Sequence, residues 1–333
     1  MSEAENKPGR ELPYVMAINE GIREVLREQK DAFIAGEDVA IAGSVYGYCT
    51  GLLEEFGEDR VVDTPISEKG IMGLGVGASA TGCRPIIDLM FMDFVGECMD
   101  EIANQMAKMR FMFGGKATLP VTVLTMGGAG GSLAAQHSQS LEAWLAHLPG
   151  MKVVMPSDAY DAKGMIISAT RDNNPVFVVL NKASLAMTME VPEGSYEVPL
   201  GEACVRTQGK DLTIVAFGRM VHEAIASVEK LKEIGIEAEV IDARSVQPFD
   251  TETVVNSIKK THRALVVHEA VKFGGIGGEI SAQIQEEAFD YLDAPVMRVA
   301  APFSPVPFSP ALEQIYIPNA DAIVAKVKET LAL

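Results

Sequence analysis

Residues 152–180 read KVVMPSDAYDAKGMIISATRDNNPVFVVL, and this stretch decides the fold class. Residues 153–155 form a short apolar run that predicts a buried strand, and residues 159–171 have the spacing of an amphipathic helix. A second apolar run at 176–180 predicts another strand. A strand, a helix and a second strand in succession form a βαβ unit, which places the two strands parallel in one sheet.

The same alternation continues on both sides of this unit. Further strands are predicted at 39–42, 85–90 and 121–125, and further helices at 15–29, 67–80, 96–111 and 138–146. Beyond residue 204 the pattern predicts strands at 212–217, 237–242, 264–268 and 296–299, and helices at 221–234, 251–260, 277–291 and 321–331. The proline-rich run 301–318 is predicted to be an ordered surface loop. The predicted fold class is therefore α/β, with two doubly wound domains.

The alternation breaks between these two regions. The segment SLAMTMEVPEGSYEVPLGE, residues 184–202, contains prolines and glycines and has no clean period. Residues 186–203 are therefore interpreted as a linker between domains. The predicted organisation is a disordered tail at 1–12, a first domain at 13–185 and a second domain at 204–333.

Composition excludes several classes of partner. The chain has 333 residues, with 28 Lys and Arg against 46 Asp and Glu, so its formal net charge is −18. A surface this acidic repels nucleic acid and anionic membranes, and both are discounted as partners. No run of about 18 apolar residues occurs, so no membrane span is predicted. Four cysteines without a C-x-x-C pair predict reduced thiols in a cytoplasmic protein, not a zinc site or a disulfide framework.

Two glycine-containing motifs resemble nucleotide or anion sites. Gly73-x-Gly75-x-x-Ala78 fits the dinucleotide fingerprint superficially, but it falls inside a predicted helix and not at a strand-to-helix turn. The reading as an NAD site is therefore rejected. The glycines of 274–278 follow a predicted strand and open a helix, which suits an anion site or, more commonly, a tight turn.

Two titratable residues, His137 and Glu68, lie at positions where a side chain could transfer a proton. His137 follows a glycine-rich stretch at 127–131 and precedes a predicted helix, a position that suits proton transfer but equally a structural, hydrogen-bonded histidine. Glu68 stands where an extended segment turns into a helix, and a carboxylate is favoured there by the helix dipole alone. The residues by themselves favour the structural interpretation in both cases.

Several segments together resemble one family, the β subunits of the thiamine-diphosphate-dependent E1 components of 2-oxo acid and acetoin dehydrogenases. The matching segments are GEDV (36–39), DTPISE (63–68), AQHSQS (135–140), KVVMPSDAYDAKG (152–164), RDNNP (171–175) and VVHE (266–269). Each is weak alone, but their order and spacing cover the chain from about residue 14 to its end. The resemblance implies a pyrimidine-binding domain followed by a transketolase C-terminal-type domain.

The resemblance also implies roles for single residues. Glu68 matches the glutamate that bonds N1′ of the thiamine aminopyrimidine and controls its protonation, so that the cofactor can become a nucleophile. Phe94 matches the aromatic residue that stacks on the aminopyrimidine ring, and Met90 matches another residue in the wall of the pocket that holds this ring. Glu37 matches an acid near the cofactor that belongs to a proton relay. His137 matches the histidine that manages protons during transfer to the lipoyl group of E2.

A structural potassium site is a further implication of the resemblance. Its ligands would be backbone carbonyl groups, and nothing in the side chains themselves predicts a cation there. The matching residues are Val121, Ala169, Thr170, Asp172 and Asn174.

The Gly-Asp-Gly motif, which holds Mg²⁺ and the diphosphate in thiamine enzymes, does not occur. The resemblance therefore implies that an α subunit supplies both in an α2β2 heterotetramer, and that the β chain is inactive alone. Residues 89–94 and 111–117 look most like acetoin dehydrogenase β subunits, with pyruvate and branched-chain 2-oxo acids as alternative substrates. Two other classes remain for comparison, a self-contained NAD-dependent dehydrogenase and a noncatalytic assembly module.

Overall fold

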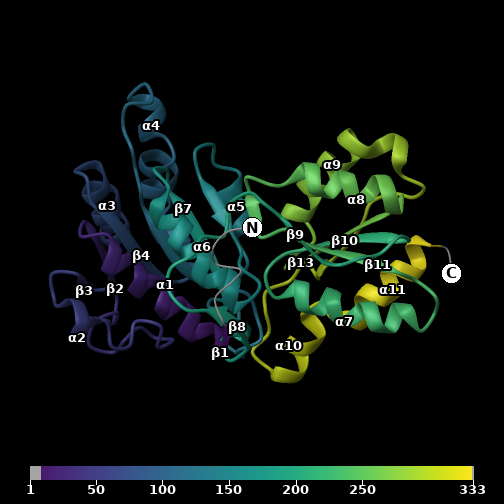
Figure 1. Cartoon of the computed structure of the whole chain (residues 1–333), viewed down its shortest axis with the longest axis horizontal. Coiled ribbons are helices and arrows are strands. Elements are labelled where there is room, and N and C mark those ends of the chain that lie inside the picture. Colours follow the sequence, from purple (N-terminus) through teal and green to yellow (C-terminus); the bar gives the residue numbers. More distant parts are fainter. Residues whose placement is uncertain (1–8, 332–333) are drawn as a thin grey trace. The chain divides into compact units, whose positions relative to one another are not determined.

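A computed structural model describes residues 9–331, and the chain divides into two compact α/β units whose elements are labelled in Figure 1. Within the described residues, the first unit comprises 9–127 and 144–200, and the second comprises 128–143 and 201–331. The chain thus enters the second unit twice. Residues 128–143, which lie inside the predicted first domain 13–185, thus group by their contacts with the second unit.

The first unit is built on a parallel sheet with the strand order β6-β7-β5-β4-β2-β3. Its strands are nearly continuous apolar runs, as expected for a sheet covered on both faces. A separate antiparallel pair joins β1 to β8. The elements are β1 (Gly9–Pro13), α1 (Tyr14–Glu28), β2 (Ala32–Gly36), α2 (Leu52–Phe56), β3 (Val61–Asp63), α3 (Glu68–Ala80), β4 (Arg84–Phe91), the 3-10 helix η2 (Met92–Cys98), the π-helix η3 (Glu101–Met106), α4 (Met109–Met112), β5 (Thr122–Gly127), β6 (Lys152–Val154), α6 (Ala159–Arg171), β7 (Val176–Asn181), η4 (Lys182–Ser184) and β8 (Thr188–Pro192).

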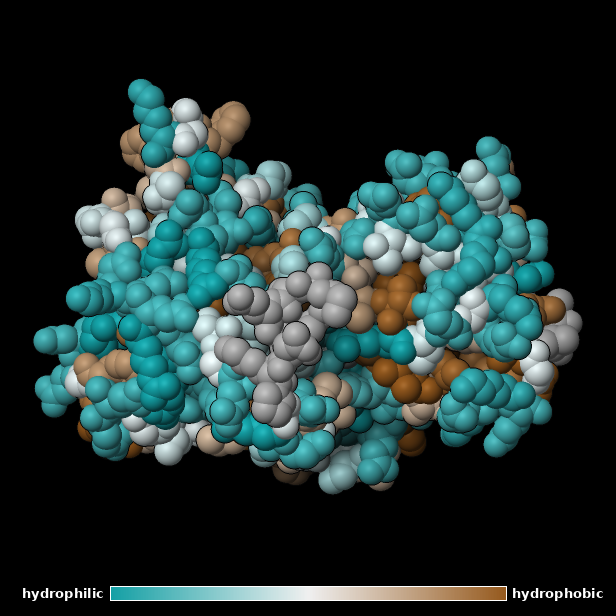
Figure 2. All heavy atoms as spheres, in the orientation of Figure 1, coloured by the Kyte–Doolittle hydropathy of each residue, from teal (hydrophilic) through white to brown (hydrophobic). Residues whose placement is uncertain are grey.

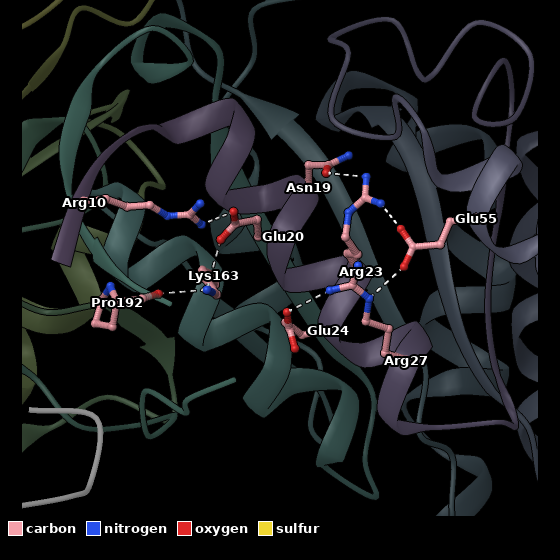
Figure 3. Close-up of polar contacts among 9 residues, drawn as sticks. All are labelled: Arg10, Asn19, Glu20, Arg23, Glu24, Arg27, Glu55, Lys163 and Pro192. Carbon is pink, nitrogen blue, oxygen red and sulfur yellow. Dashed lines mark hydrogen bonds and ion pairs between the residues drawn. The ribbon is translucent and has the colours of Figure 1, made fainter. Parts of the chain in front are cut away.

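Helices α1 and α6 pack against each other on this sheet. Gly21 in α1 permits the close approach, because a Cβ there would lie 3.1 Å from the carbonyl oxygen of Lys163 in α6. The Lys163 side chain is fully buried, and its ammonium group meets Glu20 at 3.1 Å and the Pro192 carbonyl at 3.0 Å (Figure 3). A buried ammonium group needs such partners, because leaving it unpaired would be strongly destabilising.

The second unit has the strand order β14-β13-β10-β11-β9, with β9 antiparallel and the other strands parallel. Its apolar core gathers residues of β10, β11 and β13 with α7 and α11. The elements are β9 (Cys204–Thr207), β10 (Leu212–Ala216), α7 (Met220–Lys232), β11 (Ala238–Asp242), β12 (Ser245–Gln247), α8 (Thr251–Thr261), β13 (Ala264–Val271), α9 (Ile276–Ala288), the 3-10 helix η5 (Phe289–Tyr291), β14 (Met297–Ala301), α10 (Pro310–Tyr316) and α11 (Ala320–Thr330). One further helix, α5 (Glu142–Ala146), lies where the chain returns to the first unit.

The strand predicted at 39–42 is wrong, and the strand lies upstream at β2. The Asp63 carboxylate accepts hydrogen bonds from the backbone N–H groups of Ala40 and Ile41, at 2.6 and 3.2 Å. Gly43 and Ser44 then adopt φ values of 74° and 70°. Backbone N–H groups that donate to a side chain cannot also donate to a neighbouring strand. The apolar run 39–42 therefore forms a turn and not a strand.

Other predicted boundaries also need correction. The helix predicted at 96–111 is divided into η2, η3 and α4, and the one predicted at 138–146 shrinks to α5. Gly96 lies inside η2, and a glycine there lowers the propensity for a regular α-helix. The predicted loop 301–318 contains α10, which starts with Pro310 at a position where proline favours a helix.

The predicted linker and tail take part in the β1–β8 pair. Residues 188–192 of the predicted linker form β8, and residues 9–12 of the predicted tail lie in β1. The rest of that tail, residues 1–8, lies outside the described residues. No helix within residues 9–331 combines the length and apolar character required to cross a bilayer.

Candidate functional site

The sheet of the first unit has a topological switch point between β2 and β4. From β2 the chain moves outward to β3, whereas β4 lies on the other side of β2 and the sheet continues through β5. In open α/β sheets, ligands bind outside the carboxyl ends of the strands at such a point. Gly36, the last residue of β2, pairs with Asp88 in β4 and with Asp63 in β3. The residues around these strand ends are therefore the candidate site.

Two of the predicted site residues come together at this edge. Glu37 directly follows β2, and Glu68 is the first residue of α3, which follows β3. The pKa of Glu37 is raised by its partial burial, and further by the charges of Glu68 and Asp38. Such a contribution requires a neighbouring carboxyl group, so Glu37 keeps a proton more readily than an isolated exposed glutamate does.

Asp88 is a third acid at this edge, and the sequence analysis missed it. Its side chain is 4% exposed, and its Oδ1 accepts a hydrogen bond from the Met90 N–H at 2.8 Å. Burial raises the pKa of Asp88 to about 6; interactions with Tyr48 and the Met90 N–H oppose the rise, and Glu37 adds to it. An acid at the end of a buried strand was the available signal, but the alignment of β4 with β2 was needed to interpret it.

Met90 lies at an irregularity of β4. The register between β4 and β5 shifts between Asp88 and Phe91, and Met90 has a φ of 59°. A left-handed conformation in a residue with a Cβ costs about 1 kcal/mol, so it marks a place where neighbouring contacts fix the chain. Bulges of this kind redirect side chains beside binding sites. The predicted place of Met90 in a pocket wall agrees with this local geometry and stays a prediction.

Phe94 lies in η2 and is half-buried. Its ring and that of Phe91 form a T-shaped pair with a centroid distance of 5.4 Å, and Phe91 forms a second T-shaped pair with Tyr46 at 5.6 Å. Edge-to-face pairs hold aromatic rings in fixed orientations. The half-buried ring of Phe94 thus keeps a defined orientation and suits a stacking role, which stays a prediction.

Asp88 gives a pH-dependent test of this geometry. Its pKa is raised from 3.8 to about 6 in the folded chain, so its contribution to stability is fully present below pH 3.8 and is lost as the pH rises through 6. Asp88→Asn removes this titration but keeps an oxygen for the Met90 N–H. The variant's free energy of unfolding relative to wild type is expected to rise by about 2 kcal/mol from pH 4 to pH 8. Urea unfolding across this range measures the difference, and an equal difference at both ends would contradict the assigned cause.

His137, the remaining predicted catalytic residue, belongs to the second unit. It is half-buried in the loop that follows β5, and α5 begins only at Glu142. The predicted site residues therefore form two groups. Glu37, Glu68, Met90 and Phe94 lie in the first unit, and His137 lies in the second.

Two of the glycines of 274–278, Gly275 and Gly277, allow close packing on a buried histidine. The His268 ring is 1% exposed, and a Cβ at Gly275 or Gly277 would lie 2.7 or 2.5 Å from it. The pKa of His268 is lowered to about 4 by burial and by Arg298. Packing on the neutral His268 ring explains Gly275 and Gly277 without an anion, in agreement with the tight-turn alternative.

The carbonyl groups predicted to bind potassium lie around the end of α6. One nitrogen of the Arg84 guanidinium donates to the carbonyl oxygens of Thr170 and Asp172, at 2.8 and 3.1 Å. The carbonyl of Val121 accepts from the Val176 N–H at 2.9 Å. Two of the predicted ligand oxygens thus converge, and they already interact with a cationic side chain. Within the described residues, no cluster of three His, Cys, Asp or Glu side chains forms a metal site.

Comparison with known proteins agrees with this architecture. Residues 10–188 match the transketolase pyrimidine-binding domain, and residues 201–323 match the transketolase C-terminal domain. A solved structure described as a split-gene transketolase, inactive β4 tetramer, superposes with a TM-score of 0.81, at 25% identity over 97% of this chain and 99% of that chain.

Curated relatives match over nearly the whole chain. The β subunit of acetoin:2,6-dichlorophenolindophenol oxidoreductase from Bacillus subtilis is 46% identical over 95% of this chain and 96% of the relative. The corresponding subunit from Cupriavidus necator is 45% identical over 97% of this chain and 98% of the relative. The pyruvate dehydrogenase E1 component β subunit of Bacillus subtilis is 43% identical over 96% of this chain and 99% of the relative. With both domain matches, these identities show that the chain belongs to the transketolase-like family that contains the E1 β subunits of acetoin and pyruvate dehydrogenases.

Proposed function

We propose that the chain is the β subunit of a thiamine-diphosphate-dependent E1 enzyme that cleaves acetoin and passes the acetyl unit to a lipoyl-bearing E2. The observation that carries the proposal is the placement of Glu37 and Glu68 after the paired strands β2 and β3, at the switch point of the first unit. When bound, thiamine diphosphate supplies the carbanion chemistry that amino acid side chains lack. This chain supplies acids that hold a proton for the pyrimidine, and an oriented aromatic ring at Phe94.

Acetoin is preferred over pyruvate because the two relatives named for acetoin are 46% and 45% identical to this chain. A pyruvate dehydrogenase β subunit at 43% identity keeps pyruvate as the second candidate. Cleavage of acetoin next to its carbonyl group releases acetaldehyde, whereas oxidation of pyruvate releases CO2.

The test is turnover by the purified chain together with a cognate α subunit, thiamine diphosphate, Mg²⁺ and an artificial electron acceptor. We expect kcat/KM for acetoin to exceed that for pyruvate and for branched-chain 2-oxo acids. The reverse order would assign the pyruvate or branched-chain alternative. Turnover of none of them by a correctly assembled complex would contradict the proposed function.

The proposed α subunit has a candidate docking segment in the first unit. Phe111, at the end of the short helix α4, is 88% exposed, and the next two residues, Met112 and Phe113, are also exposed. Figure 2 shows hydrophobic side chains beside hydrophilic ones over the part that Figure 1 labels α4. An apolar cavity of about 730 Å³ lies beside Phe111 and Arg110.

This segment also differs in charge from the rest of the chain. Residues 108–116 carry Lys108, Arg110 and Lys116 and no acid, whereas the whole chain has a formal net charge of −18. Exposed aromatic residues, Met and Arg are enriched on surfaces that bind another protein. We refer to residues 108–116 as the α4 segment. Its composition supports an acidic and apolar surface on the α subunit as the partner.

Two parts of the proposal concern ions. Mg²⁺ and the diphosphate are assigned to the α subunit, because the chain lacks the Gly-Asp-Gly motif. Potassium is assigned to the carbonyl groups of Val121, Ala169, Thr170, Asp172 and Asn174. The potassium assignment rests on the family resemblance alone, because the Arg84 guanidinium already donates to the Thr170 and Asp172 oxygens.

A further inference from the structure

Two residues with side chains in the loop 128–134 of the second unit adopt a backbone conformation that is normally favoured only by glycine. Ser132 and Ala134 have φ values of 51° and 60°, in the left-handed region. Gly128 and Gly130 adopt φ values of 82° and 101°. A residue with a Cβ stays in this region only where its surroundings hold it there. Ser132 must therefore be held by groups outside its own loop.

Glu313 supplies most of these contacts. Its Oε1 accepts a hydrogen bond from the Gly130 N–H at 2.8 Å. Its Oε2 accepts from the Ser132 N–H at 2.9 Å and from the Ser132 hydroxyl at 3.3 Å. The Glu313 side chain is 4% exposed, so these donors satisfy a carboxylate that water hardly reaches. Hydrogen bonds to a buried carboxylate are short and strong, and they fix both partners.

Glu269 provides a second anchor. It lies in β13, and its Oε1 accepts a hydrogen bond from the Ala129 N–H at 2.6 Å. The neighbouring Glu142 is almost fully buried, and burial together with the charge of Glu269 raises the pKa of Glu142 to about 7. Because Glu142 readily keeps its proton, the pair avoids two full negative charges. Glu269 then serves as the hydrogen-bond acceptor for the loop.

We propose that Glu313 is a positioning residue, with Glu269 as a second anchor, that fixes residues 129–132 and thereby the place of His137. The proposal rests on the proposed function, because His137 serves acyl transfer only in an E1 enzyme. Glu313 lies in α10 and Glu269 in β13, both labelled in Figure 1, and the two hold consecutive turns of one loop. A carboxylate is required because each of its two oxygens accepts a hydrogen bond from a backbone N–H group of the loop. Glutamine would present an N–H2 group to one of the backbone donors.

The first test is amide hydrogen exchange in the full chain, followed by mass spectrometry. In Glu313→Gln, the amides of 129–132 are expected to exchange at least ~10-fold faster than in wild type, because one anchoring bond is lost. Ser132→Ala removes only the hydroxyl contact, and Glu287→Gln changes an exposed glutamate elsewhere in the same unit. Both controls are expected to keep wild-type exchange in this segment. Unchanged exchange in Glu313→Gln would overturn the proposal.

The second test separates positioning from stability. In the complex with its α subunit, Glu313→Gln is expected to slow acetyl transfer to a lipoyl domain at least ~10-fold more than turnover with an artificial acceptor. Equal losses in both assays would reduce Glu313 to a structural residue and overturn the positioning role. Wild-type turnover with the acceptor tests the proposed function separately. If Glu313→Gln does not fold, rapid exchange of the Gly130 and Ser132 amides in wild type would overturn the proposal, and slow exchange would support it.

Discussion

Glu68→Gln is expected to lower kcat for acetoin at least ~100-fold, the usual range for loss of a group that transfers protons. Glutamine keeps the size of the side chain but cannot exchange a proton as a carboxyl group does. Glu68 opens α3 beside Glu37, so the substitution also removes one member of the acidic pair. Steady-state turnover of the assembled enzyme with an artificial acceptor measures the effect.

The matched control is Glu58→Gln, because Glu58 is exposed in the same unit and its loss changes the net charge equally. Wild-type activity is expected for this variant. Thermal unfolding and co-purification with the α subunit should be unchanged in both variants, since Glu68 is only half-buried. A Glu68→Gln enzyme that keeps more than half of the wild-type kcat would remove Glu68 from the mechanism.

The second large effect concerns assembly. The chain alone is expected to show no turnover, and addition of the α subunit should restore it in proportion to the complex formed. Phe111→Ala is expected to weaken this association at least ~10-fold, because exposed aromatic residues at the centre of an interface carry much of the binding energy. Phe289, 66% exposed in the second unit, provides the control substitution Phe289→Ala.

Analytical ultracentrifugation of the mixed subunits gives the association constant for each variant. Reversal of charge at Arg110 in the same α4 segment should slow association, most strongly at low salt. Equal affinities for wild type and Phe111→Ala would exclude the α4 segment as the docking surface while leaving the rest of the proposed function in place.

The sequence predicts the elements whose pattern is local. The stretch 152–180 does form β6, α6 and β7, and the bounds of α6 agree in full with the prediction. Helices α1, α3, α7 and α8 also lie close to their predicted ranges, because each buries one apolar face against a sheet. A 3.6-residue period contains enough information to place such elements.

Features that depend on distant parts of the chain were missed. The β1–β8 pair joins two segments about 180 residues apart, and no local pattern indicates it. The hydrogen bonds from the N–H groups of residues 40 and 41 to Asp63 also depend on a distant segment, and they explain why the strand predicted at 39–42 is a turn. The assignment of residues 128–143 to the second unit likewise depends on tertiary contacts such as those of Glu313.

The residues of the candidate site also differ in whether the sequence alone could identify them. Glu68, Glu37, Phe94 and Met90 were assigned from the resemblance, whereas composition and spacing alone favoured structural roles. Asp88 was missed because its meaning depends on the register that aligns it with Gly36 at the switch point. Residues at strand ends acquire chemical significance only when strand order is known.

The most direct test of the central claim is calorimetric titration of thiamine diphosphate with Mg²⁺ into this chain alone, into the α subunit alone and into the complex. We expect saturable binding by the complex at one cofactor for each αβ pair, and none by this chain alone. Equally tight binding by the isolated chain would contradict the claim that it forms only the pyrimidine half of a shared site.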